Sequence, residues 1–449
     1  MHKKLFTAML AGGIIVPVLA QADDSIVTIY GKLRADFENV KATGATNPAN
    51  DIPSRNRVSS NTSYIGFKGS EDLGLGLKAI YQIEQGVNVD SGPSSTSGNG
   101  FANRNSNVGL SSKSLGTAFY GNWETPYKLI TKVLDPFDNV SVFSAYRAIF
   151  GSPGGNVNSN PTGSATSGGS IAAGFGRREN NSVQYWMPNY KGLSARLAYE
   201  ANEGRSAISA ANANTVNPYL WSASATYESS PYYLSVGYER HRDFLVNSLA
   251  NTTAVVFPLA LGPLTATGQP TRSQHTGIRV GAGYTTDITG LGTSRIVAAY
   301  ERLEYNATGA AIGPNVSRFT KNNYFVAASH KYGGNIFRAS YVQASDGGCT
   351  FTDGTACNSA GLGAKAFSLG YGYALSKRTE VYVAFVRIIN DTRTAYNFGA
   401  NGLGTTVVAP PGVNGANPAA FTGAGFSGNT GIGAGADPTG YGIGINHVF

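Results

Sequence analysis

The sequence contains few charged residues and, beyond its N-terminal segment, no long apolar run. Charged side chains make up 13% of the 449 residues, about half of the share that is usual in soluble domains. No apolar stretch after the first segment approaches the roughly 20 residues that a membrane-spanning helix needs. These deficits argue against a helical membrane bundle and favour short strands that are exposed to something other than water.

Histidine and cysteine are also scarce, which weighs against an enzyme or a metal protein. The chain has 5 His and 2 Cys, and His241, His275, His330 and His447 lie on separate segments without metal-ligand spacing. Gly-x-Gly patterns carry no information in a chain with 58 Gly. Lys and Arg are spread along the chain without a cluster, which argues against nucleic acid as a partner. We therefore expect no enzyme activity, no metal site and no cofactor.

The chain begins with the pattern of a removable secretion signal. His2, Lys3 and Lys4 form a basic head, residues 5–19 an apolar body, and residues 20–22 an A-x-A cleavage site. A buried first helix is the alternative, but the apolar run is short and acidic residues follow it. We expect residues 1–22 to be removed. Residues 23–449 should form one domain, because no linker divides them into parts of different composition.

Glycine, aromatic residues and an alternation with a period of two are what the chain has in abundance. It contains 58 Gly and 25 Tyr. In a strand expected over residues 26–37, apolar side chains share one face and polar side chains the other. The C-terminal residues alternate in the same way, with Tyr441, Ile443, Ile445 and Phe449 on one face. This period is typical of strands that contact lipid on one side.

Tight turns and long polar loops alternate between the expected strands. Residues 40–60 and 392–437 are two of eight expected long loops, and residues 189–192 and 376–378 are two of seven short turns. The arrangement predicts an all-β fold, a transmembrane antiparallel β-barrel of 16 strands with all long loops at one end. Closure would leave no strand edge exposed. A soluble β-sandwich or a β-helix array is the alternative.

Several segments resemble those of a known family. The strongest match is SYIGFKGSEDLGLGLKA at residues 63–79, which resembles the second strand, turn and third strand of the trimeric general porins, particularly those of β-proteobacteria. Further segments match in order at residues 107–111, 181–190, 373–379 and 444–449. The resemblance implies a water-filled barrel in the outer membrane, a homotrimer, and a third long loop folded into the pore.

The third long loop is expected at residues 125–179, the longest connection in the chain. Its segment Leu134-Asp-Pro-Phe137 matches the family's loop. Length alone would also fit a loop that lies outside the barrel. The first half of the loop, however, is rich in apolar and aromatic side chains that need cover. We therefore expect it to pack inside the barrel.

The resemblance also supplies candidates for a pore constriction, where lining charges set ion selectivity. Lys32 and Arg178 match family positions for lumen cations, and Arg34 shares the strand face of Lys32. Asp135 and Asp138 would form the acidic side of the loop. For each of these residues the alternative is a solvated lumen side chain without control of flux.

Two wall positions depart from the family. Tyr64 and Asn122 stand where the family often has arginine, so part of the usual arginine ladder is missing. The size and charge preference of the family therefore cannot simply be transferred. Tyr64 and Trp123 could instead form an aromatic contact surface at the constriction.

Cys349 and Cys357 lie eight positions apart within one expected long loop. In a chain exported to an oxidising space, this spacing predicts a disulfide. Half of a metal site is the alternative, but no His or third Cys lies beside the pair. Closing so short a ring would stabilise the loop by about 3 kcal/mol or less.

Together these features predict a lipid-embedded channel for passive diffusion of small hydrophilic solutes and ions across the cell outer membrane. The first alternative is a substrate-selective channel with an aromatic-lined constriction. A non-conducting adhesin barrel is a remoter one. The charges near the expected constriction predict a weak preference for anions.

Overall fold

The computed structural model describes residues 27–90, 101–138, 141–154, 174–203, 205, 217–244, 272–308, 316–351, 353–399, 402–403 and 432–449. The expected signal peptide, residues 1–22, lies outside these residues, so its removal stays a prediction. Within the described ranges, no helix is both long enough and apolar enough to cross a membrane.

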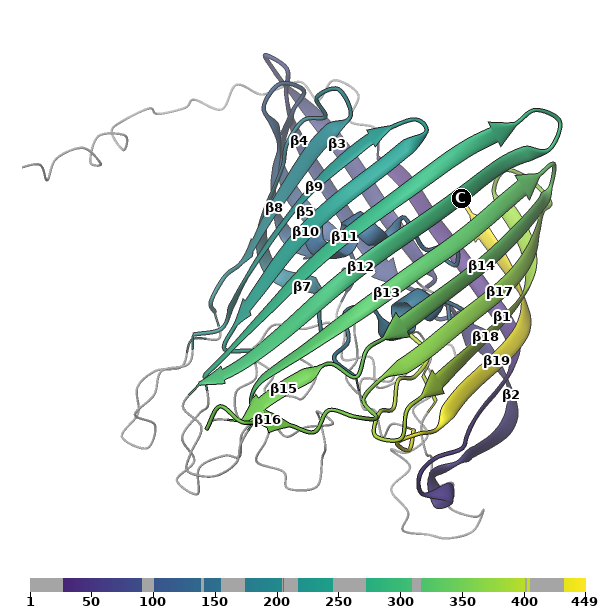
Figure 1. Ribbon diagram of the computed structural model, residues 1–449. Coiled ribbons are helices and arrows are strands. Elements are labelled where there is room, and N and C mark those ends of the chain that lie inside the picture. The colour runs from purple at the N-terminus through teal and green to yellow at the C-terminus, as the bar shows by residue number, and fades with distance from the viewer. Residues whose placement is uncertain are drawn as a thin grey trace, which may run out of the picture.

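The strands form a single antiparallel sheet that closes on itself (Figure 1). β1 (Thr28–Thr43) pairs with β19 (Asp437–Val448), and this pairing joins the first strand to the last. The other strands are β2 (Ile52–Ser60), β3 (Tyr64–Gly74), β4 (Leu77–Gly86), β5 (Ser106–Ser112), β6 (Gly116–Glu124), β7 (Arg178–Trp186), β8 (Leu193–Glu200), β9 (Tyr219–Ser229), β10 (Tyr232–Arg242), β11 (Arg272–Ile288), β12 (Gly292–Thr308), β13 (Val316–Tyr332), β14 (Asn335–Ala344), β15 (Gly348–Phe351), β16 (Ala356–Cys357), β17 (Ala364–Ala374) and β18 (Thr379–Asn390).

These elements make a barrel of 16 strands within the described part of the chain. β1 pairs with β3 along its first half and with β2 along its second half, so β2 and β3 are one interrupted strand. β14 and β15 likewise pair with successive parts of β13, so they also form one interrupted strand. Among the described strands, β16 pairs with β15 alone. The expected barrel is confirmed.

The first connection is shorter than the sequence predicts. Residues 40–60 are expected as a loop, but β1 extends to Thr43, and β2 begins at Ile52 after a short 3-10 helix at Pro48–Asn50. The residues of β1 that pair with β2 run from Ala35 to Ala42. The expectation is wrong because this strand carries polar residues on both faces. It therefore lacks the alternation on which a sequence-based assignment depends.

Side chains alternate between an apolar outer face and a polar lumen. On β1, Leu33 and Phe37 are exposed outward, whereas Asp36 and Glu38 are buried in the lumen. Exposed tyrosines gather on strand segments beside the short turns, as in the girdles that mark the membrane interface of such barrels. They include Tyr185, Tyr227, Tyr232, Tyr284, Tyr332, Tyr371 and Tyr373.

Two short helices of the third long loop lie within the ring of strands (Figure 1). Thr125 caps α1 (Pro126–Lys132) and Ser144 caps α2 (Ala145–Ile149), each by accepting a backbone N–H of the first turn. Buried apolar side chains of the loop face the wall, which confirms that the loop folds inward. They include Tyr127, Ile130, Leu134, Phe143, Tyr146, Ile149 and Phe150.

Two glycines let α1 approach the wall. A Cβ atom on Gly237 of β10 would lie 2.7 Å from the Ile130 side chain, and one on Gly281 of β11 would lie 2.7 Å from the Leu134 side chain. These positions are thus restricted by the close approach of the helix to the sheet.

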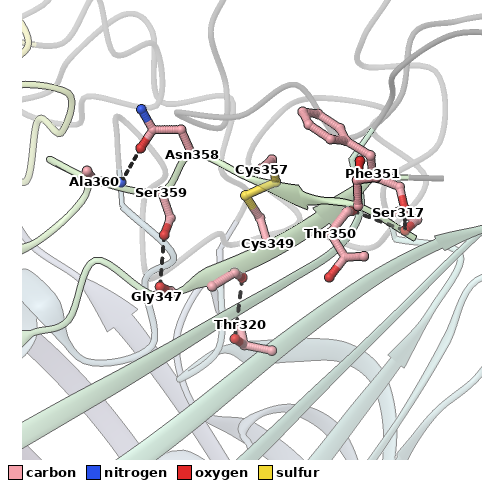
Figure 2. Close-up of a disulfide and its surroundings, with 12 residues drawn as sticks. Ser317, Thr320, Gly347, Cys349, Thr350, Phe351, Cys357, Asn358, Ser359 and Ala360 are labelled. Carbon is pink, nitrogen blue, oxygen red and sulfur yellow. Dashed lines mark hydrogen bonds between the residues drawn. A yellow bond between two sulfur atoms is a disulfide. The ribbon is translucent and has the colours of Figure 1, made fainter. Parts of the chain in front are cut away.

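The cysteines lie in a small hairpin, formed by β15 and β16, at the end of the barrel opposite the short turns (Figure 1). Cys349 of β15 and Cys357 of β16 are opposite one another and form a disulfide (Figure 2). The Ser359 hydroxyl donates to the Gly347 carbonyl oxygen at 3.0 Å, and the Thr320 hydroxyl donates to the Gly348 carbonyl oxygen at 3.4 Å. The first bond joins the two sides of the connection that carries the hairpin, and the second attaches β15 to β13.

Candidate pore constriction

One face of the third loop is fixed to the wall through the buried carboxylate of Glu301 on β12. This carboxylate accepts from the Tyr127 hydroxyl at 2.8 Å, the Gly151 N–H at 2.7 Å and Asn323 Nδ2 at 2.8 Å. It also pairs with Arg279, whose Nε lies 2.9 Å away. The Arg279 guanidinium in turn stacks 4.1 Å from the centre of the Tyr127 ring. A single shared carboxylate thus joins the start of α1 and the segment just after α2 to the sheet.

Aromatic packing holds α2 on the same side. The Tyr146 ring stacks on Phe150 with centroids 4.7 Å apart, and its edge meets Phe325 of β13 at 5.0 Å. The Ser368 hydroxyl of β17 donates to the Phe143 carbonyl oxygen at 2.6 Å. These contacts exclude water from the space between α2 and the wall.

The tip of the loop crosses the lumen and reaches β1. Asp138 forms an ion pair with Lys32 and accepts from Arg34 Nη2 at 3.0 Å. Its backbone has φ of +68°, a left-handed conformation that aspartate tolerates better than most residues. The Asp138 side chain is still 48% exposed. Three predicted constriction residues therefore meet at one point.

Asp135 lies within the loop and takes no part in the ion pairs between Asp138 and β1. Its carboxylate accepts from the Phe137 N–H at 3.0 Å and from the Ser144 hydroxyl at 2.5 Å, and it is buried. It therefore shapes the link between α1 and α2. A cavity of about 250 Å³ lies between this link and the wall; its lining includes Arg34, Asp135, Asp138, Arg338, Glu380 and Tyr382.

A second charged cluster stands where the loop leaves β6. The Glu124 carboxylate lies 3.2 Å from Lys128 Nζ, 2.9 Å from Lys132 Nζ and 3.4 Å from Arg178 Nη2. Arg178 Nε also donates to Asn105 Oδ1 at 2.8 Å. Burial lowers the pKa of Lys128 to about 7, and the repulsion from Arg178 adds to this effect while Glu124 opposes it. The cluster has more cations than carboxylates.

Tyr64 and Asn122 both contact Arg104, a residue that the sequence analysis missed. The Arg104 guanidinium lies 4.8 Å from the centre of the Tyr64 ring, and its Nε donates to Glu84 at 2.5 Å. Asn122 Nδ2 donates to the Arg104 carbonyl oxygen at 3.2 Å. A guanidinium therefore stands beside Tyr64 although position 64 itself is not arginine.

The sequence carries a signal for two of the residues that the sequence analysis missed, Lys128 and Lys132, and none for Arg104. Lys128 and Lys132 are four positions apart, which places both on one helical face once a helix is assumed there, and Glu124 ends β6 just before that helix. Arg104 carries no such signal, because the pairing of β4 with β5 and of β5 with β6 brings it to Glu84 and Asn122.

The described side chains offer no evident metal site. No group of three or more His, Cys, Asp and Glu residues among them is arranged to hold a metal ion. The buried rings of His241 and His275 lie with centroids 5.9 Å apart and are packed among aromatic side chains such as Phe175.

Comparison with known sequences identifies relatives for most of the chain. A sequence model of the Gram-negative porin family matches residues 7–393. The chain is 31% identical over 202 residues to the major outer membrane protein P.IB of Neisseria gonorrhoeae. This match covers 44% of the chain and 48% of that protein, so the chain spans about half the length of this curated relative.

Solved structures share the fold over nearly the whole chain. The anion-selective porin from Comamonas acidovorans has a TM-score of 0.64 at 20% identity, with 95% of this chain and 100% of that chain covered. OmpT of Vibrio cholerae, in a trimer form, has a TM-score of 0.55 at 14% identity, with 95% and 100% covered. At these identities the similarity concerns the barrel fold.

Proposed function

This chain belongs to the Gram-negative porin family, and we propose that it forms a water-filled outer-membrane channel for passive diffusion of small hydrophilic solutes and ions. The observation that carries the proposal is the charged contact between the loop tip and β1, inside a barrel with an exposed apolar outer face. An apolar outer face suits lipid and a charged lumen suits water.

The proposed constriction lies between the loop and the wall formed by β1, β3, β6 and β7. Lys32, Arg34 and Asp138 line its centre, Tyr64, Asn122 and Arg178 line the adjoining wall, and Asp135 supports the loop. Asp138 is shared by two cations and Glu124 by three. The local excess of positive charge supports a preference for anions, and salt should weaken it by screening.

We extend the proposal to a homotrimer of chains that lack residues 1–22 and retain the barrel of residues 23–449. Membership of the family supports this assembly, as does the trimer form in which OmpT of Vibrio cholerae was solved. The mass of the complex extracted in mild detergent tests it. A species with the mass of one chain would contradict the trimer.

Planar-bilayer recording of the purified protein tests the channel. Large, stepwise currents that rise linearly with voltage are expected. A complete lack of current from correctly folded protein would overturn the proposal and favour the adhesin alternative. Reversal potentials in a KCl gradient test the charge preference, and cation selectivity at low salt would contradict it.

One observation favours the substrate-selective alternative. Tyr64 and Tyr30 lie edge to face with centroids 6.2 Å apart, next to the Arg104 guanidinium. Such a surface could retain a solute that has both apolar and polar parts. Small conductance together with saturable block by a solute would favour this alternative over a general channel.

A further inference from the structure

A separate cluster of aromatic side chains lines the lumen near the short-turn end of the barrel. Phe119 and Trp123 of β6 and Trp186 of β7 meet edge to face, with ring centroids between 5.2 and 5.9 Å apart. Phe119 is buried, whereas Trp123 and Trp186 are partly exposed. The neighbours Tyr120 and Tyr185 are exposed on the outer face. The indole rings therefore offer aromatic surface to the lumen.

A guanidinium stands beside this surface. Arg196 of β8 is the register partner of Trp186, and its guanidinium lies 4.8 Å from the centre of the Trp186 ring. Among the described residues its guanidinium forms no hydrogen bond or ion pair, and it interacts electrostatically with Tyr233 and Glu228. Because stacking occupies the face of a guanidinium, its N–H groups remain available to an anion.

Other guanidiniums stacked on lumen aromatics differ in this respect. Arg104, over Tyr64, pairs with Glu84. Arg279, over Tyr127, pairs with Glu301. A carboxylate therefore already pairs with each of these cations. Among the described residues the Arg196 guanidinium has no such carboxylate, so it can pair with an anionic solute.

The cluster lies between the third loop and the short-turn mouth. Trp186 ends β7 at this mouth and pairs with Thr117, the second residue of β6. Tyr233 interacts electrostatically with Arg196. Its hydroxyl donates a hydrogen bond to the Ile130 carbonyl oxygen of α1 at 2.5 Å. A solute that has passed the constriction would meet this surface next.

We propose that Phe119, Trp123, Trp186 and Arg196 form an aromatic platform that binds small aromatic monocarboxylates such as benzoate. The ring of the solute packs against the indoles, and its carboxylate accepts hydrogen bonds from Arg196. Charge-assisted bonds of this kind are stronger than neutral ones, and aromatic rings favour edge or offset contacts of the kind seen within the cluster. The inference rests on the proposed channel, through which the solute reaches the lumen.

Tryptophan fluorescence tests the platform directly. The chain has 3 Trp, and Trp221 is 52% exposed on the outer face. In a Trp221→Phe background, the signal reports on Trp123 and Trp186 alone. Benzoate should produce a saturable change in the folded, detergent-solubilised protein. Cyclohexanecarboxylate, which lacks the aromatic ring, and benzyl alcohol, which lacks the charge, should each bind about tenfold more weakly.

A pair of matched variants identifies the cation. Arg196→Gln should weaken benzoate binding about tenfold, because it removes the charge-assisted bonds but leaves the rings in place. Lys331→Gln removes one cation at the short-turn end of β13 and should leave binding within about twofold. Equal binding of the three solutes, or no effect of Arg196→Gln, would overturn the platform.

Conductance separates this inference from the proposed channel. Stepwise current without saturable benzoate binding would overturn the platform alone. Saturable, Arg196-dependent binding without any current would support the platform and overturn the channel.

Discussion

The third loop meets two unlike halves of the barrel wall. Toward β10–β17 it is joined by buried groups, with the Glu301 carboxylate bound to Arg279 and Tyr127 and with aromatic rings packed around Phe325. Toward β1 it is joined by the ion pairs of Asp138, whose side chain is half-exposed to the lumen.

The difference indicates that the buried contacts anchor the loop, whereas the contact with β1 influences conduction. Breaking a buried ion pair by removing one partner costs about 3–5 kcal/mol, whereas an exposed pair typically contributes about 0–1 kcal/mol. The buried half therefore determines where the loop lies. Lys32 and Arg34 are largely buried but the Asp138 carboxylate is half-exposed, so its pairs should hold the loop less strongly than Glu301 does and leave this carboxylate accessible to passing ions.

The largest effect is expected from Glu301→Ala, which would remove the carboxylate that anchors the loop to the wall. It would leave Arg279 buried without its carboxylate, a cost of about 3–5 kcal/mol. The loop should detach, so the single-channel conductance should rise and become noisy, and the temperature of thermal unfolding should fall. Single-channel recording and a thermal scan measure both effects.

Glu304→Ala is the matched control for this variant. Glu304 lies on the same strand, and its ion pair with Arg318 is solvent-exposed. Its removal should change neither conductance nor unfolding temperature appreciably. If Glu301→Ala behaved like this control, the shared carboxylate would not be the anchor of the loop.

Asp138→Asn should change selectivity instead of loop position. Loss of this carboxylate leaves Lys32 and Arg34 without their shared anion, so the anion-to-cation permeability ratio should rise about two- to fivefold. The unfolding temperature should fall less than in Glu301→Ala, because the Asp138 side chain is half-exposed. Reversal potentials in a KCl gradient measure the ratio. Asp353→Asn removes the same charge from the outer hairpin and should leave it unchanged.

A smaller effect is expected from the titration of Lys128. Burial lowers the pKa of this side chain to about 7, so it is charged below that pH and neutral above it. The anion preference should therefore decline by at most about twofold as pH rises through 7. Lys128→Arg retains its charge and should abolish this component of the decline. An unchanged pH dependence in that variant would contradict the assignment.

The smallest effect on the channel is expected from loss of the disulfide. Cys349 and Cys357 join β15 to β16, and neither residue takes part in the contact of Asp138 with Lys32 and Arg34. Cys349→Ser should destabilise the hairpin by about 3 kcal/mol or less and leave conductance unchanged. Bilayer recording checks the conductance. Thiol titration of unreduced, unfolded protein should find no free thiol in the parent chain.

Local pattern predicted those features that depend on neighbouring residues along the chain. The outward positions of Tyr441, Ile443 and Ile445 followed from a period of two, and all three are exposed. The apolar first half of the third loop predicted its inward packing. The pattern was uninformative at residues 52–60, where a polar strand has no apolar face to reveal it.

Contacts between distant segments could not be predicted in this way. Arg104 meets Tyr64 through strand register, and Glu301 meets Gly151 across 150 positions of sequence. The substrate-selective alternative paired Trp123 with Tyr64 at the constriction, whereas the Trp123 ring packs on Phe119 and Trp186.

The amino-acid pattern was sufficient to predict a closed barrel with an apolar outer face, because alternation along each strand decides which side chains contact lipid. The pairing of charges, by contrast, could be known only from the folded chain. Ion pairing depends on distances of a few ångströms between strands and loop, and closure of the barrel sets those distances. Within the described part of the chain, the same closure leaves the Arg196 guanidinium without an ion pair beside the Trp186 ring, while Arg104 and Arg279 each meet a carboxylate.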